Sequence, residues 1–303
     1  MRIVSLLPAA TELVHALGLG DVLVGRSHEC DTPVSVAELP VVTRAEIDER
    51  LSSGEIDRLV REFARDGRPL YRIDDALLKR LRPDVIVTQE LCDVCAITPG
   101  QVDEAIRGLE PRPRVVRLGP GGLDDVLDDL VRLGRATGRV EQAEACRRRL
   151  ERRIAELTVE ASVSPRPRVL FLEWLDPAFG AGHWNPELIE RAGGQSVLDV
   201  RPGDHSRTID DDTLDRVCPE LIFVAACGFT AERARREWDA LDDDHPVRRV
   251  HRRSGARLHF ADGNAYFNRP GPRLVDSLEV LAAAVRPGAV TYASESPTHV
   301  SHA

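Results

Sequence analysis

Hydrophobic positions along the chain alternate between short continuous runs and helical spacing. An apolar run over residues 2–7 is followed by apolar residues spaced as in a helix over residues 9–19, and by a second apolar run over residues 22–25. Buried strands that alternate with amphipathic helices at this interval are typical of α/β proteins with parallel sheets. Two later runs, over residues 84–88 and 114–118, predict two further strands of the same lobe.

The pattern changes between Gly122 and Ala161, where proline is absent and apolar residues recur at helical spacing. At 1.5 Å per residue, a helix of about 40 residues would extend for about 60 Å, which is longer than one lobe. We therefore expect a rigid connector that packs against two lobes. Gly134 and Gly138 each cost about 1 kcal/mol inside a helix, so a break at this point is the alternative.

The α/β pattern then starts again. Apolar runs predict strands over residues 169–174, 221–225 and 257–261, and a helix–proline–strand sequence occurs in both halves, over residues 77–87 and 215–224. We predict an α/β fold of two Rossmann-like lobes joined by a single long backbone helix, with the ligand cleft between the lobes. The expected parts are the N-terminal lobe 1–120, the connecting helix 121–162, the C-terminal lobe 163–287 and a disordered tail 288–303.

Charge and hydropathy argue against two classes of partner. The chain of 303 residues has a formal net charge of −9 and a pI of about 5.6, so it lacks the basic surface that nucleic-acid binding requires. No apolar run reaches the length of about 18 residues that a membrane span needs. The apolar run behind Met1 is too short for a secretory signal. We therefore expect a cytoplasmic protein, exported only if the sequence is a trimmed mature form.

Sequence motifs of common enzyme classes are absent. The chain contains no Gly-x-Ser-x-Gly, no phosphate-binding P-loop, no His-Glu-x-x-His and no dinucleotide-binding glycine set, each of which serves a defined step of chemistry. This favours a binding protein over an enzyme.

Two segments of the first lobe carry a resemblance to a known family. They are Arg-Ile-Val-Ser-Leu-Leu-Pro-Ala-Ala-Thr-Glu over residues 2–12 and Val-Gly-Arg-Ser-His-Glu-Cys-Asp-Thr-Pro over residues 24–33. With the two helix–proline–strand sequences, they make the chain resemble the cobalamin-binding members of the helical-backbone substrate-binding proteins of ABC transporters. The resemblance extends over residues 2–286. It implies that a corrinoid is captured in the cleft with little hinge motion, is not chemically changed, and is passed to an ABC transporter.

Cysteine and histidine gather where strands of the first lobe end. His28 and Cys30 follow the second predicted strand, and Cys92 and Cys95 follow the strand over residues 84–88. Both positions lie at carboxyl ends of strands, where α/β proteins bind ligands. Thiolate and imidazole ligands suit zinc or iron, so these residues predict a metal site. Burial of the cysteines as small apolar side chains, or a dithiol redox pair, are the alternatives.

An aromatic loop follows the first strand of the second lobe. It contains Trp174, Phe179, His183 and Trp184, and loops at strand ends are where binding residues concentrate. The aromatic faces can stack on a planar ligand such as a corrin ring, and His183 can coordinate cobalt or hydrogen-bond the ligand. Alternatively, Trp174 and Phe179 fill the core of the lobe.

A second loop precedes the last predicted helix and contains Tyr266, Phe267, Asn268 and Arg269. We expect these side chains to reach the cleft, where Arg269, near a helix N-terminus, can hold a ligand carboxylate or phosphate. Alternatively, Pro270 marks the entry into the last helix and has no part in binding.

Two functional hypotheses follow. The first is a protein that binds cobalamin, another corrinoid or a related metal chelate without turnover. The second is a cytoplasmic metalloprotein or enzyme with zinc or iron on some of His28, Cys30, Cys92 and Cys95.

Overall fold

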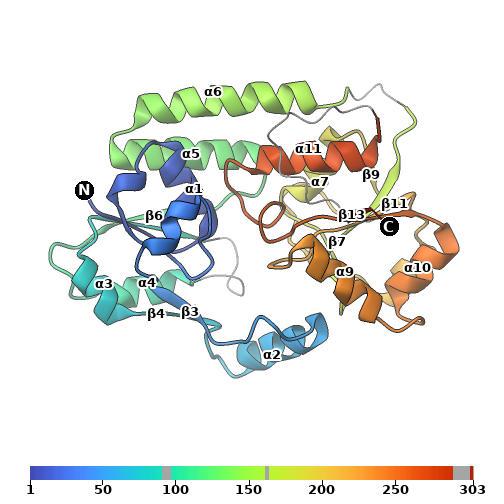
Figure 1. Ribbon diagram of the computed structural model, residues 1–303, viewed down its shortest axis with the longest axis horizontal. Helices are drawn as coiled ribbons and strands as arrows, with labels where there is room; N and C mark the ends of the chain where they lie inside the picture. The colour runs from blue at the N-terminus through green and yellow to red at the C-terminus, as the bar shows by residue number, and fades with distance from the viewer. Residues whose placement is uncertain (91–96, 161–163, 289–300, 303) are drawn as a thin grey trace. The chain divides into compact units, whose positions relative to one another are not determined.

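The computed structural model describes residues 1–90, 97–160, 164–288 and 301–302 (Figure 1). The chain forms two compact units that do not follow simple sequence boundaries. Unit 1 contains Met1–Leu51, Arg58–Pro120 and Asp124–Leu150, and unit 2 contains Ser52–Asp57, Gly121–Leu123 and Glu151–Ala303. Within the described residues, no helix combines the length and the apolar character that crossing a membrane requires.

Unit 1 is built on a four-stranded parallel sheet with the strand order β2-β1-β5-β6. Its strands are β1 Ile3–Ser5, β2 Leu23–Gly25, β5 Val85–Gln89 and β6 Arg114–Leu118. The central strands β1 and β5 are almost entirely buried. Parallel strands covered on both faces are continuous apolar runs in sequence. The apolar runs therefore predicted these strands.

Helices and a small antiparallel sheet complete unit 1. They are α1 Pro8–Ala16, α2 Ser53–Arg65, α3 Asp75–Leu81 and α4 Pro99–Ala105, the 3-10 turns η1 Gly20–Val22 and η2 Val34–Glu38, and the strands β3 Thr43–Ala45 and β4 Tyr71–Ile73. The first residues of α2 belong to unit 2, where Ile56 packs against the core.

The connecting segment is two helices rather than one continuous helix. They are α5 Leu123–Thr137 and α6 Val140–Leu157. The single long helix expected from the sequence is interrupted because Gly138 adopts φ +71°, a left-handed conformation that ends a helix. A Cβ on Gly134 would lie 2.5 Å from the Ala143 side chain, so glycine at this position lets α6 approach α5 closely. The two helices lie side by side in Figure 1, and Asp128 of α5 pairs with Arg147 of α6 at 2.5 Å.

Unit 2 contains a second, mixed sheet with the path β10-β8-β7-β11-β12-β13, and β9 also pairs with β7. The strands β7 Arg168–Trp174, β11 Leu221–Val224 and β12 Arg257–Phe260 are parallel. The short strands are β8 Phe179–Gly180, β9 Gln195–Ser196, β10 Arg207–Thr208 and β13 Ser301–His302. Strand β13 lies in the segment that we expected to be disordered, and it pairs antiparallel with β12. The α/β fold class predicted from the sequence is confirmed.

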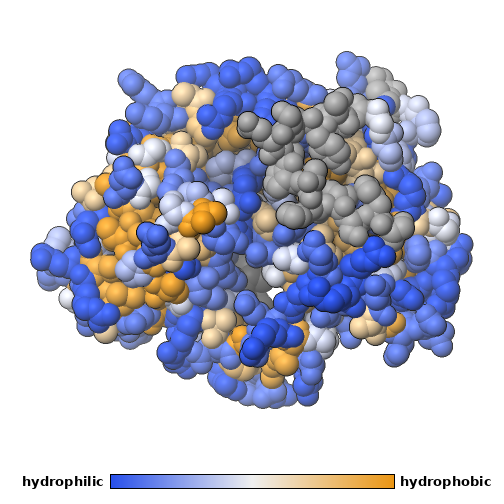
Figure 2. Space-filling model, in the orientation of Figure 1, coloured by the Kyte–Doolittle hydropathy of each residue, from blue (hydrophilic) through white to orange (hydrophobic). Residues whose placement is uncertain are grey.

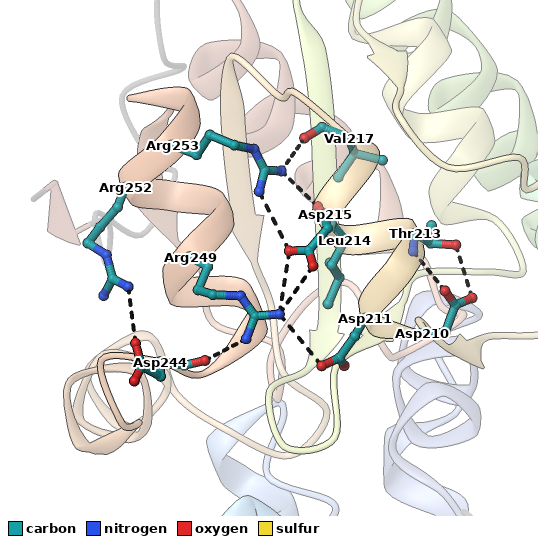
Figure 3. Close-up of polar contacts among 10 residues, drawn as sticks. All are labelled: Asp210, Asp211, Thr213, Leu214, Asp215, Val217, Asp244, Arg249, Arg252 and Arg253. Atoms are coloured by element: carbon teal, nitrogen blue, oxygen red, sulfur yellow. Dashed lines mark hydrogen bonds and ion pairs between the residues drawn. The ribbon is translucent and has the colours of Figure 1, made fainter.

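The helices of unit 2 are α7 Asn185–Arg191, α8 Asp211–Arg216, α9 Ala231–Ala240, α10 Pro246–Ser254 and α11 Leu274–Val285. Helix α10 is held to α8 by arginine side chains (Figure 3). The Arg253 guanidinium donates to the Leu214 and Val217 carbonyls at 2.9 and 2.8 Å, and so satisfies carbonyl groups at the end of α8. Arg249 pairs with Asp215 at 3.4 Å. The face shown in Figure 2 is accordingly hydrophilic over α9 and α10.

Candidate functional site

The carboxyl ends of β7, β11 and β12 bring three loops of unit 2 together. Strand β7 leads into the aromatic loop, β11 ends before the exposed Cys227, and β12 leads into the loop with Tyr266 and Asn268. In α/β sheets, ligands bind outside this edge. We therefore define the candidate site as these three loops.

Two loops of the candidate site are in direct backbone contact. A Cβ on Gly263 would lie 2.1 Å from the Ala226 carbonyl oxygen, so only glycine permits this approach. The amide nitrogen of Asn268 donates to the Ala225 carbonyl at 3.1 Å and to the Gly263 carbonyl at 2.9 Å, and so joins the two loops. Its Oδ1 atom is buried and has no hydrogen-bond partner in the described part of the chain.

Four of the eight predicted ligand residues are buried in unit 2. Exposure is 3% for Trp184, 8% for Tyr266, 0% for Phe267 and 6% for Arg269. The Trp184 indole donates to the Phe267 carbonyl at 2.8 Å, and the Phe267 ring meets Phe171 edge to face. These side chains therefore pack within unit 2, and their role as ligand contacts stays a prediction.

The other four predicted ligand residues, Trp174, Phe179, His183 and Asn268, are half-buried and retain surface for a ligand. The Trp174 indole donates to the Ser53 carbonyl at 3.2 Å and to the Asp176 carbonyl at 3.1 Å. Its ring packs on Phe229 with the ring centres 4.9 Å apart. Part of Trp174 thus serves to hold the segment that begins α2.

His183 lies at the start of α7 in an unusual backbone conformation. Its φ is +54°, a region that residues other than glycine rarely adopt. Its ring lies beside the rings of Trp184 and His205, with ring centres 5.6 and 5.2 Å away. Burial lowers the pKa of His183, and the neighbouring His205 lowers it further. The imidazole is therefore neutral at neutral pH, with a lone pair available to a metal.

Glu173, at the end of β7, holds the backbone on either side of the two histidines. Its carboxylate accepts hydrogen bonds from the Ser206 hydroxyl at 2.5 Å and from the Gly182 N–H at 3.1 Å. A Cβ on Gly182 would lie 2.4 Å from the Ser206 backbone nitrogen, which makes glycine necessary here. Glu173, Ser206 and His205 are not among the residues predicted from the sequence. His205 lies in a polar segment without periodicity, so only its spatial pairing with His183 reveals it.

In unit 1, Cys30 belongs to a buried polar cluster at the ends of β1 and β2. The Thr11 hydroxyl lies 3.0 Å from the Cys30 sulfur and 2.8 Å from the Ser5 hydroxyl. The Ser27 hydroxyl is 3.3 Å from the same sulfur. Cys30 is 3% exposed. The motif residues around it therefore hold the loop after β2 against α1.

His28 makes a separate contact, in which its Nδ1 lies 2.7 Å from the Thr43 hydroxyl. Burial lowers its pKa. Cys92 and Cys95, the other two predicted metal ligands, lie outside the described residues. Within the described ranges, no group of three or more His, Cys, Asp or Glu side chains is arranged to hold a metal ion. The zinc or iron site on His28, Cys30, Cys92 and Cys95 stays a prediction.

Comparison with known proteins identifies similar chains over nearly the whole length. A family model described as periplasmic binding protein matches residues 3–245. A vitamin B12-binding protein of Photorhabdus laumondii is 24% identical in an alignment of 293 positions that covers 93% of this chain and 86% of that protein. These matches confirm the resemblance found in the sequence, and they give no support to the metalloenzyme hypothesis.

Two solved structures share the fold. The periplasmic vitamin B12 binding protein of Vibrio cholerae has a TM-score of 0.64 at 20% identity, over 94% of this chain and 96% of that one. A periplasmic heme binding protein of Pseudomonas aeruginosa has a TM-score of 0.68 at 22% identity, over 96% of this chain and 95% of that one.

The expected cytoplasmic location is wrong. The matching family model and the structural relatives are periplasmic binding proteins. The expectation depended on the absence of an export signal, and such an absence does not define a compartment.

Proposed function

The chain belongs to the periplasmic binding protein family, and from this premise we propose that it binds cobalamin, another corrinoid or a related metal chelate. It would act by binding and release, without turnover, and would pass the ligand to an ABC transporter. The names of its relatives, which include vitamin B12 and heme binding proteins, support a metal-containing macrocycle as the ligand class.

The observation that carries this proposal is the half-buried imidazole of His183 at the edge of the unit 2 sheet. A metal held by a macrocycle already has its equatorial ligands, so one axial imidazole is sufficient to complete its coordination. Burial lowers the pKa of His183 and keeps the ring neutral, and only the neutral ring can bind a metal. The strained φ of +54° is the kind of outlier that clusters at binding sites.

A further feature supports a large ring system as the ligand. The half-buried rings of Trp174 and Phe179 provide apolar surface for the edge of the ring system.

The test is a titration of the full chain with hydroxocobalamin and, separately, with haemin, followed by visible absorption. Hydroxocobalamin has an exchangeable axial ligand, so binding of an imidazole shifts its absorption bands. We expect the wild-type chain to produce this shift and His183→Gln to lose it. His251→Gln is the matched control, because His251 is also half-buried in unit 2 but lies on α10 beside Trp238.

Equal spectral shifts in the wild-type chain and in His183→Gln would refute the role of His183. Absence of binding for both macrocycles would refute the proposed ligand class. An absorption shift with haemin but not with hydroxocobalamin would support a metal chelate as the ligand and exclude a corrinoid.

A further inference from the structure

Two histidines from different loops of unit 2 lie edge to face. His183 precedes α7, and His205 lies in the segment before β10. Their ring centres are 5.2 Å apart and their planes are nearly perpendicular, at 89°. His205 is exposed, whereas His183 is half-buried, so the pair lies at the surface of the unit.

This separation matches that of two imidazoles bound to one metal ion. A histidine nitrogen binds a transition metal at about 2.0–2.1 Å, which places the ring centre about 3.2 Å from the ion. When the angle at the metal between two such rings is about 90–110°, their centres lie about 4.5–5.2 Å apart. The observed 5.2 Å between His183 and His205 falls at the tetrahedral end of this range.

Hydrogen bonds fix the backbone beside the two histidines without using the ring nitrogens. The His183 N–H donates to the Asp204 carbonyl at 2.6 Å, and the Gly203 N–H donates to the His183 carbonyl at 2.8 Å. The hydrogen bonds of Glu173 described above hold the residues next to both histidines. Neither imidazole takes part in a hydrogen bond or ion pair with any residue that the structure describes. A held backbone that carries imidazoles with free nitrogens favours metal binding.

We propose that His183 and His205 form a two-imidazole site for a divalent transition-metal ion, bound either as the hydrated ion or within a small open chelate. Imidazole ligands suit nickel, copper and zinc. No larger ligand cluster occurs in the described part of the chain, so water or the chelator supplies the remaining ligands. The site goes beyond the macrocyclic ligands of the proposed function, because a corrin or porphyrin leaves open only its two opposite axial positions. A macrocycle can use His183 alone and cannot take both rings side by side.

The experiment is calorimetric titration of the untagged full chain with nickel chloride. We expect one nickel ion per chain, and we expect His205→Gln and His183→Gln each to weaken binding by about tenfold or more, since loss of even a supporting group costs about 10–100-fold at metal sites. His251→Gln on α10 is the matched control, and it should bind nickel as the wild type does. Repeating the titration with one equivalent of citrate separates the two ligand forms, because tighter binding with citrate indicates the chelate.

Wild-type nickel affinity in His205→Gln would overturn the proposal, and so would loss of binding in His251→Gln. The His205 side chain is exposed, so its replacement leaves no cavity, and an unchanged circular dichroism spectrum confirms that the variant is folded. Hydroxocobalamin separates this proposal from the proposed function. His205→Gln should weaken nickel binding and keep the corrinoid absorption shift, whereas His183→Gln should weaken nickel binding and lose the absorption shift.

Discussion

Replacement of Asp129 by asparagine should change how the stability of unit 1 depends on pH. The carboxylate lies on α5 with only 3% of its side chain exposed. One oxygen accepts a hydrogen bond from the Gly119 N–H at 3.0 Å, and the other lies 2.7 Å from the guanidinium of Arg132, which is more than half exposed. Burial raises the pKa of Asp129 to about 6, although Arg132 and the Gly119 N–H both act to lower it.

The sign of the effect follows from the raised pKa. The folded state binds this proton more tightly than the unfolded state, whose pKa is the ordinary 3.8. The contribution of Asp129 to stability is therefore largest below about pH 4, decreases between about pH 4 and 6, and is fully lost above pH 6. One pKa unit corresponds to about 1.4 kcal/mol, so the loss amounts to about 3 kcal/mol.

Asparagine removes the buried charge and can keep the acceptor for the Gly119 N–H. It loses the pair with Arg132, which is worth less than about 1 kcal/mol because Arg132 is exposed. We expect Asp129→Asn to match the wild type near pH 4 and to be more stable by about 1–3 kcal/mol at pH 8. Asp128→Asn is the control, since it removes the same charge from a side chain that is 60% exposed.

The assay is urea unfolding at several pH values between 4 and 8, with two optical probes. All three tryptophans, at 174, 184 and 238, belong to unit 2, so their fluorescence reports unit 2, whereas circular dichroism reports both units. The pH-dependent difference should appear in the circular dichroism transition and be smaller in the fluorescence. A difference in free energy of unfolding between Asp129→Asn and the wild type that stays constant from pH 4 to pH 8 would show that burial does not raise the pKa of Asp129.

Three further substitutions test contacts in unit 2. Gly182→Ala should lower stability by about 1–3 kcal/mol, because its Cβ meets the Ser206 backbone nitrogen at 2.4 Å; an unchanged thermal midpoint would contradict this. Arg253→Gln should lower the free energy of unfolding by about 1 kcal/mol, because its hydrogen bonds to the carbonyls at the end of α8 are lost. An unchanged urea midpoint would contradict this prediction. Trp174→Phe removes the indole bond to the Ser53 carbonyl and should raise hydrogen exchange at the start of α2 about fivefold; equal exchange would show that this bond contributes nothing.

Sequence reasoning succeeded where burial is uniform. The strand expected over residues 114–118 matches β6, and the one expected over residues 84–88 matches β5 to within one residue. A strand covered on both faces needs apolar side chains at nearly every position, so a continuous apolar run predicts it directly. The sequence alone allows either a continuous helix or a break between α5 and α6, because apolar residues keep helical spacing through Gly138. The φ of +71° at Gly138 ends the helix.

The candidate site was harder to predict, because it depends on contacts between distant residues. Trp184 is predicted to contact the ligand, and the structure places its buried indole against the Phe267 carbonyl, 83 positions away. Cys30 looked like a metal ligand, and its sulfur lies against the hydroxyls of Thr11 and Ser27. His205 carried no signal in the sequence. Composition and spacing indicate which residues are unusual, whereas their partners are decided by tertiary packing.

The assignment of Ser52–Asp57 to unit 2 means that the units cannot be separated by a single cut in the chain. A fragment that begins at residue 151 would lack Ser53, and with it the carbonyl that receives the Trp174 indole and the N–H that donates to Glu237 at 2.9 Å. It would also lose Ile56 from its core. Gene fusions, domain exchanges and truncations of this protein should therefore keep the polypeptide continuous from residue 52 onward, and proteolytic nicking at the start of α2 should destabilise the C-terminal half as well as the N-terminal one.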